Sequence, residues 1–335
     1  MMDISIPYYE DLTRISNSNI GWFLNKGPAF LHKMLTDPPP EEKNPVLERG
    51  TMIHEYLLQP EEFQKDYIIW DKSRPSSAQQ EKFCQAYASS LEIEPNKAIL
   101  EAYKAAYSTK GKTEETMLSE GSKIASTLKD YIDYLKSGDQ RIMISPYDYQ
   151  MLKKIKDNID SHKRARCIIY PWTTYAEDDD TNIKCYHEFH INWEFYGELP
   201  IKCKSLLDGL TLDFIHKKAI IYDLKTTAKL WHFEESIKTY DYLRQLMYYT
   251  MAVEWYLEEE YDQSGLEWTF EYYIIGIDTT GTHEIRVFKI DSDAVESREP
   301  DIEMALNEIT WHQANNKWDH SRAYYEGDGS EILNL

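Results

Sequence analysis

The sequence predicts a mixed α/β fold, and the order of its hydrophobic patterns is the main reason. Apolar residues recur at helical spacing in the first half, and the chain after Cys167 changes to short strand-like runs. A long helical pattern then separates these runs from two further strands and a last helix. Hydrophobic residues make up 42% of the chain, which is enough for a folded core and excludes disorder as the main state. This order is typical of a central sheet with helices packed on it.

The N-terminal half is expected to be mostly helical. Residues 16–19 offer helix caps before a helical pattern that ends near residue 35, where a run of prolines breaks the chain. A second helix is expected at residues 47–58 and a short strand at 67–70. Residues 76–137 are rich in helix-forming residues, and an amphipathic helix is expected at 147–162.

The C-terminal half is expected to supply the sheet. Strands are predicted at residues 167–175, 184–193, 201–214, 219–225, 268–278 and 284–290. Long helices are predicted at residues 233–260 and 291–317. The length fits one large domain or two small ones. Because no repeat or low-complexity linker interrupts the chain, we expect a single domain over residues 1–335, with a helical insertion at about 74–140.

Charge and composition limit the classes of function. The 37 Lys and Arg residues against 58 Asp and Glu residues leave a net charge of −21, which argues against general affinity for nucleic acid but not against a local groove. No apolar run approaches the ~20 residues that span a bilayer, and a signal peptide is not recognisable. The four cysteines show no paired spacing, so we expect reduced thiols and a cytoplasmic protein without membrane contact.

Three charged residues in a predicted hairpin carry the most specific chemical signal. Asp223 and Lys225 are two apart on one strand and share a face, and a turn centred on His216 and Lys217 would place Asp208 opposite Lys225. The alternative is an exposed Asp–Lys pair, which is common on strands. Apolar neighbours on both strands favour burial, and a buried group of this kind is costly unless a cation neutralises it.

A hard divalent cation suits two carboxylates, and Mg²⁺ combines them with phosphate oxygens and water. The lysine could then hold or help deprotonate an attacking water while the metal stabilises charge on a phosphoryl group. The residue types therefore favour metal-dependent cleavage of a phosphodiester.

Asp208, followed by Asp223-Leu224-Lys225, resembles the catalytic motif of the PD-(D/E)xK nuclease superfamily. Flanking motifs are similar to those of the RecE-like (exonuclease VIII-type) exonucleases of phages and prophages: the Gly50 to His54 segment with its Leu-Leu-x-Pro-Glu continuation, Glu188 before Trp193, and the QxxxY pair Gln245 and Tyr249. The match extends over most of the chain outside the insertion. His190 stands where the branch usually has serine, and Lys202 and Lys204 precede Asp208, so substrate preference stays open.

The resemblance implies a restriction-endonuclease-like core, a mixed central sheet flanked by helices, and a set of site residues. It implies the metal ligands His54, Glu188, Asp208 and Asp223 and the catalytic residues Asp208, Asp223, Lys225, Gln245 and Tyr249. The metal would be Mg²⁺, with Mn²⁺ as a substitute. The implied function is exonucleolytic digestion of duplex DNA ends in a bacterial or phage-infected cell. The products would be single strands for annealing recombination, with an annealing protein as partner and a homo-oligomer as the working form.

Several of these residues have a second interpretation. His54 lies among apolar residues, where a histidine is commonly a hydrogen-bonded core residue. Glu188 could be a third metal ligand or a solvated strand residue. Tyr249 could be simple core material, or it could pack beneath Gln245 while the amide binds the lysine or a DNA phosphate. The basic residues between 153 and 166 could be a solvated helix face or a DNA groove.

Two other functions remain as alternatives. A strongly acidic chain could be an inactive DNA mimic or a DNA-end-binding protein, although such a protein would not need the Asp208, Asp223 and Lys225 triad. The same core could also serve a structure-specific or single-strand endonuclease.

Overall fold

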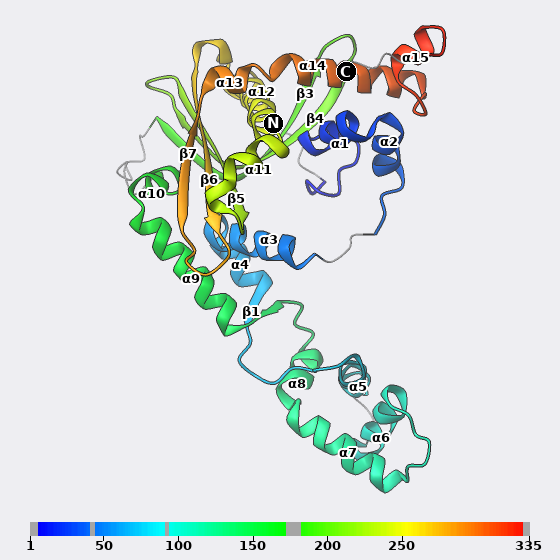
Figure 1. Ribbon diagram of the computed structural model, residues 1–335. Helices are drawn as coiled ribbons and strands as arrows, with labels where there is room; N and C mark the ends of the chain where they lie inside the picture. The colour runs from blue at the N-terminus through cyan, green and yellow to red at the C-terminus, as the bar shows by residue number, and fades with distance from the viewer. Residues whose placement is uncertain (1–5, 41–43, 91–93, 172–181, 331–335) are drawn as a thin grey trace. The chain divides into compact units, whose positions relative to one another are not determined.

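The computed structural model describes residues 6–40, 44–90, 94–171 and 182–330 (Figure 1). The chain divides into two compact units. Unit 1 comprises Met1–Pro60 and Leu152–Leu335, and unit 2 comprises Glu61–Met151. Unit 2 contains the predicted helical insertion, while the organisation as a single domain stays a prediction.

Unit 1 is built on a five-stranded mixed sheet, as the sequence predicted. Its strands follow in chain order and pair antiparallel, except that β5 and β6 are parallel. The parallel pair needs a crossover, which the helices between β5 and β6 provide (Figure 1). The strands are β3 (Ile183–Tyr196), β4 (Pro200–Asp213), β5 (Lys218–Thr227), β6 (Thr269–Asp278) and β7 (Ile285–Ile290).

Helix α12 (Tyr242–Tyr261) packs against β3, β4 and β5, and α14 (Glu299–Asn315) packs on α12. Their apolar faces form the main core with the buried side of the sheet. The other helical elements of unit 1 are α1 (Asn17–Lys26), α2 (Pro28–Thr36), α3 (Pro45–Leu58), α9 (Pro146–Ser161, which begins in unit 2), α10 (Lys163–Ile169), η2 (Leu230–His232), α11 (Phe233–Thr239), η3 (Gly265–Glu267), α13 (Ser292–Glu296) and α15 (Arg322–Glu326).

Unit 2 is mainly a small helical module. Its elements are α4 (Pro60–Asp66), β1 (Tyr67–Ile69), α5 (Ala78–Ala88), α6 (Pro95–Ala106), α7 (Glu114–Thr127), α8 (Lys129–Ser137) and β2 (Ile142–Ile144). The strand predicted at 67–70 is β1, which pairs in parallel with β2. Helices α5 to α8 share their own core around Phe83 and Tyr103, so this unit does not depend on the sheet for its apolar packing.

Local backbone chemistry breaks three of the predicted helices. Gly27, with φ at 82°, separates α1 from α2, and Asp241, with φ at 49°, begins α12 after α11. Pro300 lies in the first turn of α14, where its missing N–H has no intrahelical partner to lose.

The strand predicted at residues 167–175 is wrong over its first part. Helix α10 occupies Lys163–Ile169, and the Nδ1 atom of His162 caps it by accepting a hydrogen bond from the amide of Ala165. The β-branched residues Ile168 and Ile169 suggested a strand, but both are buried on this helix. Residues 172–175 of the prediction lie outside the described residues.

The predicted hairpin between β4 and β5 exists, but its register differs by two residues. Asp213 pairs with Lys218 and Gly209 pairs with Tyr222, so Asp208 lies at the level of Asp223 rather than opposite Lys225. A shift of two residues leaves each side chain on its predicted face. Asp208, Asp223 and Lys225 therefore still lie on the same face, although the predicted register was wrong.

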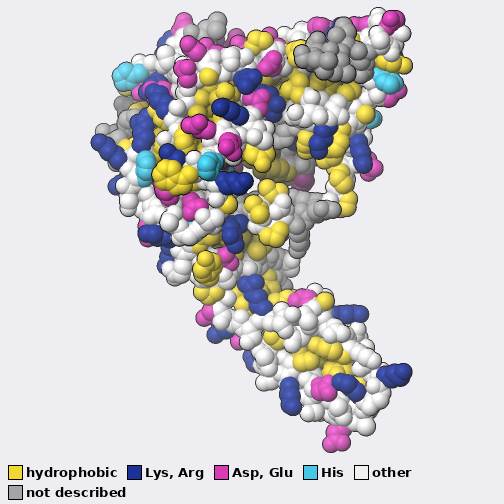
Figure 2. Space-filling model, viewed as in Figure 1, with side chains coloured by type: hydrophobic (Ala, Val, Ile, Leu, Met, Phe, Trp, Pro, Cys, Tyr) yellow, Lys and Arg dark blue, Asp and Glu magenta, His cyan; other side chains and the backbone are white. Residues whose placement is uncertain are grey.

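Charged residues of both signs are interspersed on the face drawn in Figure 2, where Lys and Arg side chains lie close to Asp and Glu side chains. Within the described part of the chain, no helix is long and apolar enough to cross a membrane.

Candidate metal centre and active site

The sheet is interrupted at the level of Glu188 and Asp208. Residues on either side of these two pair across β3 and β4, but Glu188 and Asp208 do not. Glu188 has φ at 46°, a left-handed conformation that costs a non-glycine residue about 1–2 kcal/mol. The rings of Tyr186 and Phe189 stack at 4.2 Å although they are three residues apart, which shows that the usual alternation of side chains is broken here. Such strain is typical of functional sites.

Asp208 is held where β4 and β5 separate. The ladder between these strands stops at Gly209 and Tyr222, and beyond it the amide of Leu224 donates to Asp208 Oδ2 at 2.6 Å. The carboxylate thus replaces a backbone acceptor. A Cβ on Gly209 would lie 1.9 Å from the ring of Tyr222, so only glycine allows this ring to lie over the strand next to Asp208.

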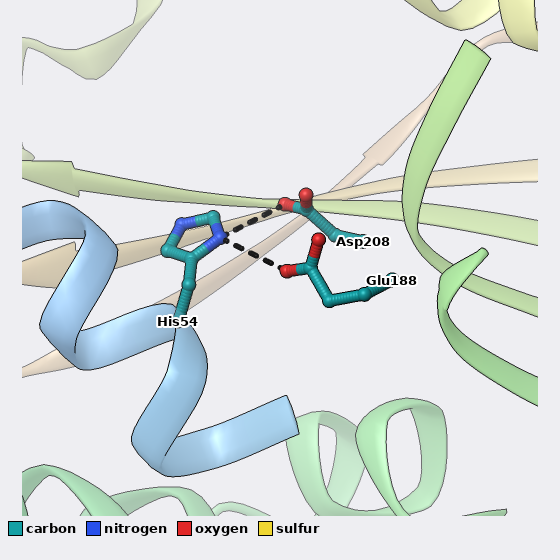
Figure 3. Close-up of side chains that lie close together, drawn as sticks. All are labelled: His54, Glu188 and Asp208. Atoms are coloured by element: carbon teal, nitrogen blue, oxygen red, sulfur yellow. Dashed lines mark ion pairs between the residues drawn. The ribbon is translucent and has the colours of Figure 1, made fainter. Parts of the chain in front are cut away.

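Helix α3 brings His54 to the same place. Gly50 lets the helix approach the end of β5, where a Cβ would be 3.3 Å from Thr226 Oγ1. His54 lies one turn further along the helix, and its Nδ1 atom is 3.7 Å from both Glu188 Oε1 and Asp208 Oδ2 (Figure 3). One ligand atom from each of these three side chains lies within 4.8 Å of the others.

A second group of side chains surrounds Asp223, which is 1% exposed. Its Oδ2 forms an ion pair of 2.5 Å with Lys225 Nζ. Its Oδ1 accepts a hydrogen bond of 2.9 Å from Gln245 Nε2, which also donates to the hydroxyl of Tyr249 at 2.7 Å. Helix α12 therefore anchors the carboxylate that orients Lys225.

Burial and mutual charge shift the pKa values of the whole cluster. Burial raises the pKa of Asp208, and it raises that of Asp223 to about 6 with the charge of Asp208 adding to the effect. Burial lowers the pKa of Lys225, but the charges of Asp223 and Asp208 outweigh it and the pKa is raised. Burial likewise opposes the charged form of His54, yet Asp208 and Glu188 raise its pKa. The cluster is therefore held together by opposite charges in a site that disfavours isolated charge.

The donor set of His54, Glu188 and Asp208 fits a divalent cation. Two carboxylates and one imidazole nitrogen are suitable ligands. A cation would also neutralise Asp208, whose anionic form burial disfavours. Asp223 lies outside this group of three, and its two oxygens contact Lys225 and Gln245. The metal-binding and catalytic roles of all these residues stay predictions.

Two tyrosines near this cluster carry no sequence motif and were not predicted. The hydroxyl of Tyr222 is buried and, within the described structure, has no hydrogen-bond partner. The ring of Tyr242 lies 5.0 Å from Lys225 Nζ. The glycine directly after Asp208, Gly209, is the sequence feature that could have indicated a side chain of the neighbouring strand packed closely against this position.

Part of the predicted basic surface is paired with other groups of the same chain. Lys156 pairs with Asp160, and Arg164 contacts Glu271 and the hydroxyl of Tyr273. Lys204 is buried and donates to two backbone carbonyls of the N-terminal segment. These cations stabilise unit 1, which leaves less free positive charge than the sequence suggested.

Comparison with known proteins defines the class of the fold. Residues 188–323 match the family model described as "PDDEXK-like domain of unknown function (DUF3799)". The match begins at Glu188 and includes Asp208, Asp223 and Lys225, while His54 lies outside it. With its five-stranded mixed sheet flanked by helices, unit 1 has the fold of a PD-(D/E)xK-like nuclease core. The fold class predicted from the sequence is thereby confirmed. The match supports a PD-(D/E)xK-like domain over residues 188–323 and hence a nuclease, while the RecE-like branch stays a prediction.

Two solved structures are similar at low identity. The chain has 12% identity and a TM-score of 0.47 to a crystal structure called "Putative exonuclease" from Eubacterium rectale, with 100% of this chain and 95% of that chain covered. It has 11% identity and a TM-score of 0.23 to SSO0001, with 74% and 94% covered. No curated protein matches the sequence.

Proposed function

We propose that the protein is a Mg²⁺-dependent deoxyribonuclease of the RecE-like type that hydrolyses phosphodiesters from the ends of duplex DNA. The observation that carries this proposal is the meeting of His54, Glu188 and Asp208 beside the Asp223–Lys225 ion pair in a PD-(D/E)xK-like fold. A set of metal ligands beside a partly buried ammonium suits cleavage of a phosphate ester.

His54, Glu188 and Asp208 would hold the cation, with Mn²⁺ as an alternative to Mg²⁺. When bound, the metal would supply Lewis-acid stabilisation of the negative charge that develops on the phosphate. Asp208 is already fixed by the amide of Leu224, so the site loses little entropy when it is filled.

Lys225 would orient the attacking water and donate a hydrogen bond to it or to a phosphate oxygen. Asp223 keeps the ammonium in place, and Gln245 keeps Asp223 in place through a hydrogen bond of 2.9 Å. Tyr249 fixes the amide of Gln245 in turn. Lys225 is thus connected to helix α12 through consecutive hydrogen bonds and an ion pair.

The exonuclease mode, the generation of single strands for annealing recombination, an annealing protein as partner and a homo-oligomeric form rest on the resemblance of the sequence motifs. They form part of the same proposal, as does activity in the cytoplasm of a bacterial or phage-infected cell.

The test compares end-labelled linear duplex with covalently closed circular duplex, each incubated with Mg²⁺ and with EDTA. We expect degradation of the linear DNA alone and its loss in EDTA. Lys225→Ala should lower the rate by about 10²- to 10⁴-fold, because it removes the group that positions the water. Lys289→Ala, which removes a lysine that pairs with Glu271 on another part of the sheet, serves as the control and should retain activity.

Each alternative has its own outcome. Cleavage of closed circles would favour an endonuclease on the same core. Absence of cleavage with Mg²⁺ and with Mn²⁺ would contradict the enzyme proposal, and binding of DNA ends or of DNA-binding proteins would then be the function to pursue.

A further inference from the structure

A row of aromatic rings runs from the core of unit 1 to its surface. Phe288 on β7 stacks on Phe233 of α11 at 5.3 Å, and Phe233 packs against Tyr242 at 6.1 Å. Tyr242 stacks on Tyr240 at 5.8 Å, with an angle of 20° between the rings. Phe233 is buried, whereas Tyr240 is 65% exposed. The row is therefore supported by the core and ends in a ring that faces solvent.

This row passes directly beside the predicted catalytic lysine. The ammonium of Lys225 lies 5.0 Å from the centre of the Tyr242 ring, a distance at which the cation and the ring attract each other. The Tyr240 ring is one stacking distance further out, so its centre lies no more than about 11 Å from the ammonium. A phosphate at Lys225 would thus carry its own base, or the neighbouring base, towards Tyr240.

The turn that carries Tyr240 is fixed in place. Its amide donates to the carbonyl of Ser236 at 3.0 Å. The next residue, Asp241, pairs with Arg244 at 3.6 Å and with Arg298 at 3.4 Å. The exposed ring is consequently positioned in advance, and stacking on it would cost little conformational entropy.

We propose that Tyr240, supported by Tyr242, is a stacking site for a nucleobase of the DNA strand whose phosphate reaches Lys225. This inference rests on the proposed nuclease function. Every base has a π-face, so the contact accepts any sequence. Inside a duplex both faces of a base are covered by its neighbours, whereas a terminal base pair and an unpaired strand have a free face. The site therefore selects DNA ends and single strands.

Calorimetric titration with a short unlabelled single strand tests the proposal, in EDTA so that no cleavage occurs and again with Ca²⁺ in place of Mg²⁺. Tyr240→Ala should weaken binding by about 5- to 100-fold, the usual effect of removing a stacked ring. Tyr240→Phe keeps the ring and should bind like the wild type. The matched control is Tyr196→Ala, which removes a tyrosine that is 72% exposed at the end of β3 and eight residues from Glu188.

Abasic oligonucleotides separate stacking from other contributions. They keep the phosphates but lack the base faces, so wild type and Tyr240→Ala should bind them equally. Equal affinity of both proteins for normal DNA would overturn the stacking site while leaving the nuclease proposal intact, provided that the wild type still cleaves DNA. Equal losses in Tyr240→Ala and Tyr240→Phe would also count against stacking. A wild type that neither binds nor cleaves DNA would overturn both proposals.

Discussion

At the scale of single residues, Asp208 depends on two neighbours that have no acid–base chemistry of their own. The amide of Leu224 donates a hydrogen bond to one oxygen of Asp208. Gly209 has no side chain, which leaves room for the ring of Tyr222 beside the strand. The position of this carboxylate is thus set in part by backbone and ring contacts.

Gly209→Ala should destabilise the protein by about 2–3 kcal/mol, because its Cβ would overlap the Tyr222 ring and force the strands apart. Urea unfolding measures the change. On a Tyr222→Ala background the ring is absent, so the same substitution should cost much less. An equal cost on both backgrounds would show that the ring is not the cause.

At the scale of elements, helix α12 contributes to the site on one side and buries an acidic side chain near other acidic residues on its opposite side. Gln245 and Tyr249 face the sheet, whereas Glu254 lies partly buried near Glu296 and Glu299 of α13 and α14. Burial, with the charges of these two residues adding to it, raises the pKa of Glu254 to about 7. Folding therefore favours the protonated form of this acid relative to the unfolded chain.

Glu254→Gln should stabilise the protein by about 1–2 kcal/mol at pH 8, a value reduced for the partial exposure of the side chain. Between the unfolded pKa near 4.5 and the folded pKa of about 7, the native state holds more protons, so the free energy of unfolding falls as pH rises. At pH 5 the substitution should have little effect. Unfolding in urea at both pH values measures this, with Glu258→Gln on the exposed side of α12 as the control. A gain of the same size at pH 5 would contradict the assignment.

At the scale of the whole molecule, the net charge of −21 opposes contact with DNA, and lysines such as Lys156 and Lys289 that could offset it are paired with carboxylates of the same chain. At the site, the carboxylates of Glu188 and Asp208 lie close together beside His54, so they repel each other. A bound cation would remove part of this repulsion and stabilise the folded chain.

Thermal unfolding should therefore respond to metal. Mg²⁺ or Mn²⁺ at a hundred times its dissociation constant should stabilise the wild type by about 2.7 kcal/mol and raise its melting temperature by several degrees. Asp208→Asn removes a ligand and should abolish the shift. Asp157→Asn, which changes an exposed residue of α9, should leave it unchanged. A shift that persists in Asp208→Asn would place the metal elsewhere.

The sequence by itself determined the residue types of the site and most of the strands of the sheet. Asp208 and the Asp223-Leu224-Lys225 segment stand out because charged residues at a spacing of two lie among apolar ones. Alternation of side chains is a local property, so β3 to β7 could be predicted from neighbouring residues alone. The face on which Asp208, Asp223 and Lys225 lie was also predictable, since it is unchanged by a shift of two residues.

Only the tertiary structure decided how these groups meet. The two-residue change of register, the left-handed backbone of Glu188 and the approach of His54 depend on contacts between segments far apart in the chain. Asp223 joins Lys225 and Gln245 because α12 packs over β5. Tyr240 becomes exposed because it lies at the turn between α11 and α12, where it is the C-cap of α11 and Asp241 is the N-cap of α12. Such contacts depend on packing and strain across the whole unit. The periodicity of a single segment carries no information about them.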